Sequence, residues 1–285
     1  MSSKVKLIEC PRDAMQGLHD FIPTETKAAY INQLLKVGFD TIDFGSFVSP
    51  KAIPQLRDTA EVLNLLDLSQ TKSKLLAIIA NTRGAEDACT YEEINYLGFP
   101  FSISETFQQR NTNSSIQESI QRVDEIQNLC IKHNKQLVIY ISMAFGNPYG
   151  DAWNGDIAVN YTEKLYQKGI RIFAMSDTIG SSNKENITDL FSKVIPAFAD
   201  AEIGAHLHST PETRFEKIAA TYEAGCRRFD AALRGIGGCP MAKEELTGNL
   251  ATESLIDYLE QIQVQTGLNK DALELAFLRA QTVFQ

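Results

Sequence analysis

The sequence predicts a (β/α)8 TIM barrel in which residues 1–285 form a single catalytic domain with additional C-terminal helices. Eight short apolar runs alternate with segments that have helical spacing. A glycine that can end a helix stands one or two residues before four of these runs. No linker-like or low-complexity tract divides the chain. An open doubly wound sheet is the alternative, but a Gly-rich dinucleotide fingerprint is absent after the first strand, which favours the barrel.

The predicted strands are rich in β-branched and aromatic residues and are apolar almost throughout. They cover 5–10, 40–46, 74–80, 99–104, 137–145, 171–177, 202–209 and 227–233. Near-continuous apolarity is typical of parallel strands that are buried on both faces. The runs therefore suit the wall of a barrel that is covered by helices.

The segments between the strands carry helix signals. Apolar residues share one helical face within 31–35 and again within 116–126. Thr24 and Asn183 suit the starts of two helices. The residues predicted to end helices before a strand are Gly38, Gly98, Asn134, Gly169 and Gly225. After residue 249, two further helical segments, 255–262 and 271–284, are predicted to pack beneath or beside the barrel.

Composition limits the possible partners. The net charge of −9, without a concentrated basic run, argues against nucleic-acid binding and favours a small-molecule substrate. No apolar run reaches 18 residues, and no signal or transit segment precedes the first strand, so we expect no membrane insertion. The five cysteines are scattered and odd in number, which fits a reducing cytoplasmic location rather than a disulfide framework.

Two histidines near the end of the seventh strand suggest a metal site. Side chains alternate between the two faces of a strand, so His206 and His208 point to the same side. A pair of structural histidines is the other interpretation. Asp13, after the first strand, and Asn249, after the eighth, could add oxygen ligands because sites form where barrel strands end. This mixed oxygen and nitrogen set would favour Mg²⁺ or Mn²⁺ over zinc.

Each of the other candidates also has a plainer interpretation. Asn249 could be only a turn residue or a helix cap. Arg12 could stabilise a developing oxyanion or form a surface ion pair. Cys239, in the Gly-rich stretch GIGGCP, could donate a proton or be a loop cysteine without a role.

Six stretches together resemble the 3-hydroxy-3-methylglutaryl-CoA (HMG-CoA) lyase family, a group of metal-dependent TIM-barrel lyases. In chain order they are PRDAMQG, SFVSPK, SDTIG, AHLHST, GIGGCP and GNLATE, and the resemblance runs from about residue 4 to residue 260. It implies a homodimeric enzyme of leucine degradation that cleaves HMG-CoA into acetyl-CoA and acetoacetate. The ordered set is far more specific than any one of these motifs.

The resemblance also implies roles for individual residues. Asp13, His206, His208 and Asn249 would bind the cation. Arg12 would stabilise the enolate oxygen, Cys239 would act in proton transfer, and Asp13 would help to move the hydroxyl proton. The supporting positions around the substrate would be Gln16, Asp43, Ser46 and Asp177. Arg110 is a candidate for contact with a phosphate of the CoA.

The chain departs from the family pattern without losing an expected metal ligand. The departures are Ala14 for Gly, Gly17 for Asn, Asp43 for Glu, Ala174 for Ser, Ser176 for Gly, Ser209 for Asp and Arg234 for Ala. Several lie near the acyl pocket or behind the ligands, so a related branched 3-hydroxyacyl-CoA is an alternative substrate. A Claisen-type synthase or an aldolase of the same superfamily, and a non-catalytic barrel that binds metal or acyl-CoA, are the rival functions.

Overall fold

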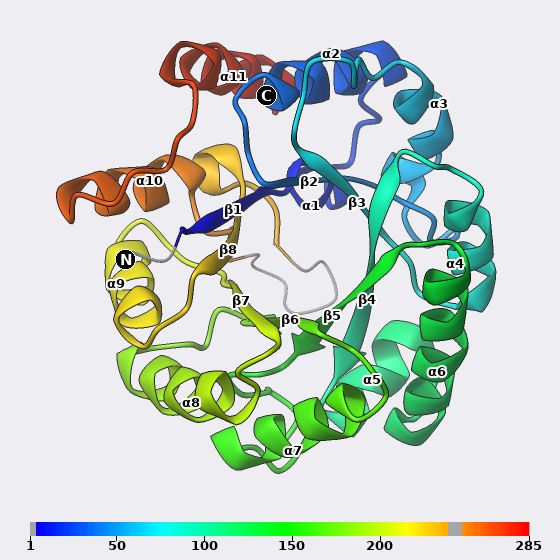
Figure 1. Cartoon of the computed structure of the whole chain (residues 1–285), viewed down its shortest axis with the longest axis vertical. Helices are drawn as coiled ribbons and strands as arrows, with labels where there is room; N and C mark the ends of the chain where they lie inside the picture. The colour runs from blue at the N-terminus through cyan, green and yellow to red at the C-terminus, as the bar shows by residue number, and fades with distance from the viewer. Residues whose placement is uncertain (1–3, 239–246, 285) are drawn as a thin grey trace.

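The computed structural model describes residues 4–238 and 247–284 and confirms the barrel. Eight parallel strands close on themselves in chain order, and β1 pairs with both β2 and β8. Helices surround the strands as an outer ring (Figure 1). The strands are β1 Lys6–Glu9, β2 Thr41–Ser46, β3 Lys74–Ile78, β4 Ile94–Ser102, β5 Gln136–Ser142, β6 Ile172–Ser176, β7 Glu202–His206 and β8 Arg228–Ala231.

The helices follow the strands as the alternation predicts. They are α1 Pro11–Gln16, α2 Thr24–Leu35, α3 Thr59–Asn64, α4 Thr82–Cys89, α5 Glu105–Thr112, α6 Ile116–Lys132, α7 Gly155–Tyr166, α8 Lys184–Ala197, α9 Arg214–Glu223, α10 Thr252–Gln261 and α11 Lys270–Val283, with short 3-10 turns at Pro54–Leu56 and Leu233–Gly235. The two predicted C-terminal helices are α10 and α11. Since α10 follows β8 and lies beside α9, it completes the ring, and α11 packs on α2 (Figure 1).

Most predicted helix ends are confirmed by the backbone. Asn183 caps α8 and accepts a hydrogen bond from the backbone N–H of Asn186. Gly38, Gly169 and Gly225 have positive φ, as does Asn134. Thr24 is different: it is the first residue of α2, Pro23 takes the cap position, and the Thr24 hydroxyl donates to Asp58 at 2.8 Å.

Gly98 was wrongly predicted to end a helix. It lies in the middle of β4, which begins at Ile94, several residues before the predicted start. A Cβ at this position would lie 2.5 Å from Ile78 and 2.9 Å from Tyr140. The glycine is therefore needed for packing inside the barrel.

The barrel interior is divided into an apolar half and a polar half. Register and alternation point one set of side chains inward from every strand. On β3, β5 and β6 this set forms an apolar cluster of its own: Leu76, Ile78, Val138, Tyr140, Ile172 and Ala174. On β7, β8, β1 and β2 the inward set includes charged residues, among them Lys6, Asp43, Glu202, His206, Arg228 and Asp230. The buried charged side chains of the barrel interior thus lie on the side formed by β7, β8, β1 and β2.

Candidate active site

The first turn after β1 brings three predicted site residues together. Pro11 starts α1 immediately after Cys10, so this short helix lies at the carboxyl end of the strand. The Arg12 Nη1 donates to Gln16 Oε1 at 2.7 Å and lies 3.0 Å from Asp13 Oδ1. The Gln16 amide donates to the same Asp13 oxygen at 2.8 Å. Arg12 and Asp13 are both buried, so their orientations are tightly fixed.

Asp43 on β2 holds the other side of Arg12. Its Oδ2 accepts a hydrogen bond from Arg12 Nη2 at 2.6 Å. Burial alone would lower the pKa of Arg12, but Asp43 and Asp13 outweigh it and raise that pKa. Burial raises the pKa of Asp43 to about 6, against the opposing effect of Arg12. Arg12 is therefore a permanent cation between two carboxylates.

Backbone pairing brings Asn249 to the histidines. The strand β7 ends at His206, three residues before the end of the predicted run 202–209, and His208 instead forms an isolated antiparallel bridge with Asn249. Two backbone hydrogen bonds, Ser209 N to Gly248 O and Leu250 N to Leu207 O, extend this pairing. Asn249 Nδ2 donates to Asp13 Oδ2 at 2.6 Å. The four residues predicted as metal ligands thus meet at the mouth of the barrel.

The gathered side chains fit a cation. Ligand atoms of Asp13, His206 and His208 all lie within 4.8 Å of one another, and all three residues are buried. His208 Nε2 is buried and has no hydrogen-bond partner in the part of the chain that the structure describes. A buried ring nitrogen without a partner is costly, and a metal ion would satisfy it. Carboxylate, amide and imidazole groups are suitable donors for a divalent metal.

Electrostatics favours the metal-binding protonation state of Asp13 and His208. Burial would raise the pKa of Asp13, but Arg12 and the two histidines outweigh it and lower that pKa to about 2. Burial and the neighbouring His206 lower the pKa of His208 to about 4. The pKa of His206 is raised, because the carboxylates of Asp230 and Asp13 outweigh burial. At neutral pH, Asp13 is ionised and His208 is neutral, which are the states that bind metal.

The remaining predicted site residues have varied surroundings. Ser46 is buried at the end of β2, where its hydroxyl accepts from Val48 N at 3.2 Å. Asp177 accepts hydrogen bonds from Ser182 and from Lys217 Nζ, at 2.5 and 2.9 Å. Cys239 lies outside the described residues. Arg110 lies on α5 with its guanidinium 4.6 Å from the Tyr149 ring centroid.

Sequence reasoning missed two charged residues that support the histidines. Asp230 on β8 faces His206, with Oδ2 3.3 Å from Nδ1. Lys217 on α9 donates to the backbone oxygen of His208 at 2.7 Å while it pairs with Asp177. For Asp230 there was a signal: Arg228 and Asp230 stand at alternate positions of the otherwise apolar eighth strand, so they share one face. The sequence contains no comparable signal for Lys217.

Two departures from the family pattern have clear positions. Ala174 lies in the apolar half of the barrel, in register with Tyr140. Ser209 is buried, and its hydroxyl has no hydrogen-bond partner within 4–238 and 247–284. Nothing in the structure explains why a serine stands there.

A closed (β/α)8 barrel with a buried Asp–His–His cluster at the carboxyl ends of its strands defines the class, a TIM-barrel enzyme with a candidate divalent-metal site. The HMGL-like family model matches residues 4–276. The chain therefore belongs to the HMGL-like family.

Hydroxymethylglutaryl-CoA lyases are similar to this chain both in sequence and in structure. Hydroxymethylglutaryl-CoA lyase of Bacillus subtilis is 33% identical over 92% of this chain and 87% of its own length. The human mitochondrial hydroxymethylglutaryl-CoA lyase is 32% identical, over 96% and 83%. An Acinetobacter baumannii HMG-CoA lyase, solved with coenzyme A and 3-methylmalate, superposes with a TM-score of 0.91 at 31% identity, covering 99% of this chain and 91% of its own.

Proposed function

We propose that this chain cleaves HMG-CoA into acetyl-CoA and acetoacetate with the help of a divalent cation. The family and its relatives give the enzyme class, a carbon–carbon lyase. One observation carries the specific proposal: Asp13 belongs to the cluster with His206 and His208 and also lies 3.0 Å from Arg12. A cation site and a fixed guanidinium are thus adjacent, and each can face one of the two charges that the reaction develops.

Asp13, His206, His208 and Asn249 would hold the cation. The Asn249 amide nitrogen donates to Asp13 and to the backbone oxygen of Ile236, which leaves the amide oxygen of Asn249 as the ligand atom. When bound, the cation lowers the pKa of the substrate hydroxyl and orients the bond to be broken. We propose Mg²⁺ or Mn²⁺, because two of the four proposed ligand atoms are oxygens.

Arg12 would stabilise the leaving fragment. The cleavage removes the proton of the tertiary hydroxyl and breaks the bond between C2 and C3 of the acyl chain. The electron pair of that bond passes to the acetyl thioester as an enolate. A guanidinium held by Asp43 and Gln16 is oriented in advance, so it can stabilise the enolate oxygen without a reorganisation cost. Asp13 would help to move the hydroxyl proton, and Cys239 would protonate the enolate carbon.

Gln16, Asp43 and Asp177 would support the substrate through the residues they hold, and Ser46 remains a prediction for contact with the substrate. Gln16 and Asp43 contact Arg12 directly. Asp177 acts at a greater distance, since Lys217 joins it to the backbone of His208. Arg110 remains a prediction for contact with the CoA.

Product analysis tests this function against its alternatives. Purified enzyme with Mn²⁺ is incubated with HMG-CoA, and acetoacetate and acetyl-CoA are quantified. We expect the two products in equal amounts. Parallel reactions use other branched 3-hydroxyacyl-CoAs, because Ala174 and Asp43 differ from the family pattern. Preferential cleavage of HMG-CoA supports the proposal. Preference for another branched 3-hydroxyacyl-CoA favours the alternative lyase. Condensation of added acetyl-CoA with a 2-oxo acid, without cleavage of HMG-CoA, would indicate a synthase.

The finer properties remain proposals. We propose a single catalytic domain over residues 1–285, a homodimer, a cytoplasmic location and a role in leucine degradation. Within the described residues, no helix is long and apolar enough to cross a membrane. Light scattering of the purified protein tests the dimer, and growth of a deletion strain on leucine tests the pathway.

A further inference from the structure

A row of charged side chains crosses the polar half of the barrel and ends at His206. Lys6 pairs with Glu202, whose Oε1 lies 3.1 Å from Arg228 Nε. Arg228 Nη1 donates to Asp230 Oδ1 at 2.9 Å, and Asp230 Oδ2 lies 3.3 Å from His206 Nδ1. The residues come from β1, β7 and β8, which are neighbours in the barrel. The row thus joins the base of the barrel to a candidate metal ligand at its mouth.

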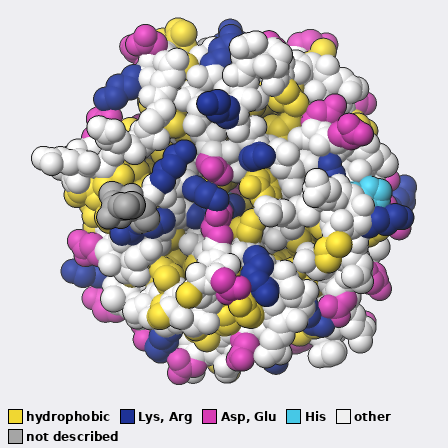
Figure 2. Space-filling view, in the orientation of Figure 1, with side chains coloured by type: hydrophobic (Ala, Val, Ile, Leu, Met, Phe, Trp, Pro, Cys, Tyr) yellow, Lys and Arg dark blue, Asp and Glu magenta, His cyan; other side chains and the backbone are white. Residues whose placement is uncertain are grey.

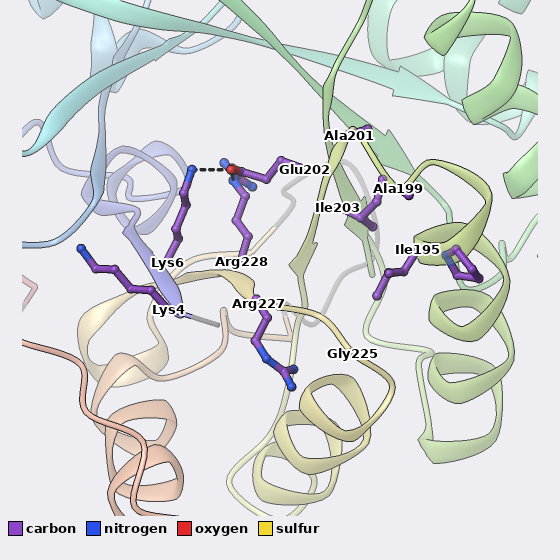
Figure 3. Close-up of a pocket in the computed structure, with 11 residues that line it drawn as sticks. Lys4, Lys6, Ile195, Ala199, Ala201, Glu202, Ile203, Gly225, Arg227 and Arg228 are labelled. Atoms are coloured by element: carbon purple, nitrogen blue, oxygen red, sulfur yellow. Dashed lines mark hydrogen bonds and ion pairs between the residues drawn. The ribbon is translucent and has the colours of Figure 1, made fainter. Parts of the chain in front are cut away.

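The outer end of the row lies at a cavity at the base of the barrel. The cavity has a volume of about 410 Å³ and is lined by Lys6, Glu202 and Arg228, among others. Figure 3 shows Lys6 and Arg228 extending toward Glu202. Figure 2 shows basic and acidic side chains side by side at the centre of the face, over the strands of Figure 1. From this end the row runs inward and becomes buried at Arg228 and Asp230.

The absence of a side chain at Gly204 leaves room for Arg228, the central residue of this row. Gly204 stands between Glu202 and His206 in the inward-facing set of β7. A Cβ at Gly204 would lie 2.8 Å from Arg228 Nη1 and 2.9 Å from Arg228 Cδ. The Arg228 side chain therefore lies across Gly204, and any larger residue there would displace it.

The two oxygens of Asp230 have different partners, and this decides how His206 is protonated. Oδ1 accepts from Arg228, so Oδ2 is the oxygen that faces His206. A carboxylate can only accept, so the imidazole must carry its proton on Nδ1. The lone pair of a neutral imidazole is then on Nε2, the nitrogen not used by Asp230.

We propose that Asp230, held by Arg228, is a positioning residue that fixes the His206 tautomer in which Nε2 is free to bind the divalent cation. This inference rests on the proposed function, because it takes His206 as a metal ligand. Carboxylates that accept from a metal-binding histidine commonly contribute 10- to 100-fold, roughly, to metal affinity.

The sharpest test is Asp230→Asn. In this variant Arg228 keeps the amide oxygen, so the amide N–H₂ faces His206 and forces the proton onto Nε2. Nitrogen-15 NMR of the metal-free protein at pH 8.5 reads the tautomer directly, since the chain has only four histidines and His206→Asn assigns the signal. We expect Nδ1–H in the wild type and Nε2–H in Asp230→Asn. We also expect Mn²⁺ affinity, from electron paramagnetic resonance, to fall by about 10- to 100-fold.

A second variant separates positioning from a general structural role. In Arg228→Met/Asp230→Asn the amide is free to turn, so its oxygen can accept from His206 Nδ1 again. We expect this double variant to bind Mn²⁺ more tightly than Asp230→Asn alone, a recovery that additive structural damage does not produce. Asp124→Asn, which breaks a half-buried ion pair between α6 and Lys168, is the matched control and should bind like the wild type.

The outcomes distinguish this inference from the proposed function. An Nε2–H tautomer in the wild type overturns the inference by itself, even if the variants do not fold. If the wild type binds Mn²⁺, His208→Ala does not, and Asp230→Asn equals the wild type in affinity and tautomer, the inference is wrong while the metal site stands. If the wild type binds no Mn²⁺, both are wrong.

Discussion

Arg12 donates two hydrogen bonds to Oδ2 of Asp43, from Nε at 3.0 Å and from Nη2 at 2.6 Å. The family pattern has a glutamate at this position, so the shorter aspartate raised the question of whether its contact is kept. The shorter Asp43 side chain still accepts both hydrogen bonds from Arg12, and it is completely buried. Arg12 is therefore held beside the cluster of Asp13, His206 and His208, and Asp43 sets the plane of its guanidinium group.

Replacing Arg12 by lysine should cut kcat by about 100- to 1000-fold, the usual effect of removing one oriented donor from a developing oxyanion. A lysine keeps the charge but cannot make the two-point contact with Asp43. Steady-state kinetics with HMG-CoA measures the effect, and Arg57→Lys on the surface serves as the control. Turnover of Arg12→Lys at the wild-type rate would show that Arg12 does not stabilise the transition state.

Cys239→Ala should lower kcat by about 100- to 10,000-fold through loss of a general acid. Mn²⁺ affinity should be unchanged, because Cys239 is not among the proposed ligands. The two readouts together, kinetics and metal titration, separate a proton-transfer role from damage to the metal site. An unchanged rate removes Cys239 from the mechanism.

Lys217→Met should destabilise the fold by about 3–5 kcal/mol, because it leaves the Asp177 carboxylate buried without its cation. It also removes the hydrogen bond to the backbone oxygen of His208. Urea unfolding measures the change. Lys193→Met removes an exposed ion-pair partner of Asp189 and should leave the unfolding midpoint near that of the wild type. Equal midpoints for both variants contradict the prediction.

The buried carboxyl of Glu9 should make stability depend on pH. Burial raises its pKa from 4.5 to about 8, against the hydrogen bonds from Thr252 and Leu233 N–H. Between these pH values the folded chain holds a proton that the unfolded chain has released. The free energy of unfolding therefore falls as pH rises from about 4.5 to 8.

Glu9→Gln should flatten this dependence, because glutamine stays neutral at every pH. Chemical unfolding at pH 5 and at pH 8 gives the change in unfolding free energy for each protein, and Glu163→Gln on the exposed side of α7 is the control. We expect wild type and Glu163→Gln to lose stability together over this range while Glu9→Gln loses less. Equal changes for all three proteins would mean that Glu9 is already ionised in the folded state.

The fold was predictable because its signals are local. Asn183 at a helix start and positive-φ glycines such as Gly38 act within a few residues, and the apolar runs mark each strand. Gly98 misled the prediction because its role comes from Ile78 and Tyr140, which lie on neighbouring strands. Packing across a barrel leaves no trace in the flanking sequence.

For the candidate site, the sequence indicated individual residues but not the contacts that bring them together. Strand alternation placed His206 and His208 on one side, although β7 ends before His208. Their approach to Asn249 depends on an antiparallel bridge between segments some 40 residues apart, and no local pattern encodes it. Asp230 was missed because its role depends on its contact with His206 on the neighbouring strand β7.

The most direct test of the account is metal-dependent acetoacetate production by one enzyme preparation. The protein is stripped with chelator, assayed with HMG-CoA, then assayed again after addition of Mn²⁺ or Mg²⁺, beside His208→Ala treated in the same way. We predict no acetoacetate from the stripped wild type, recovery on adding metal, and no recovery for His208→Ala. Acetoacetate produced at an undiminished rate without metal, or none at high enzyme concentration with it, would contradict the account.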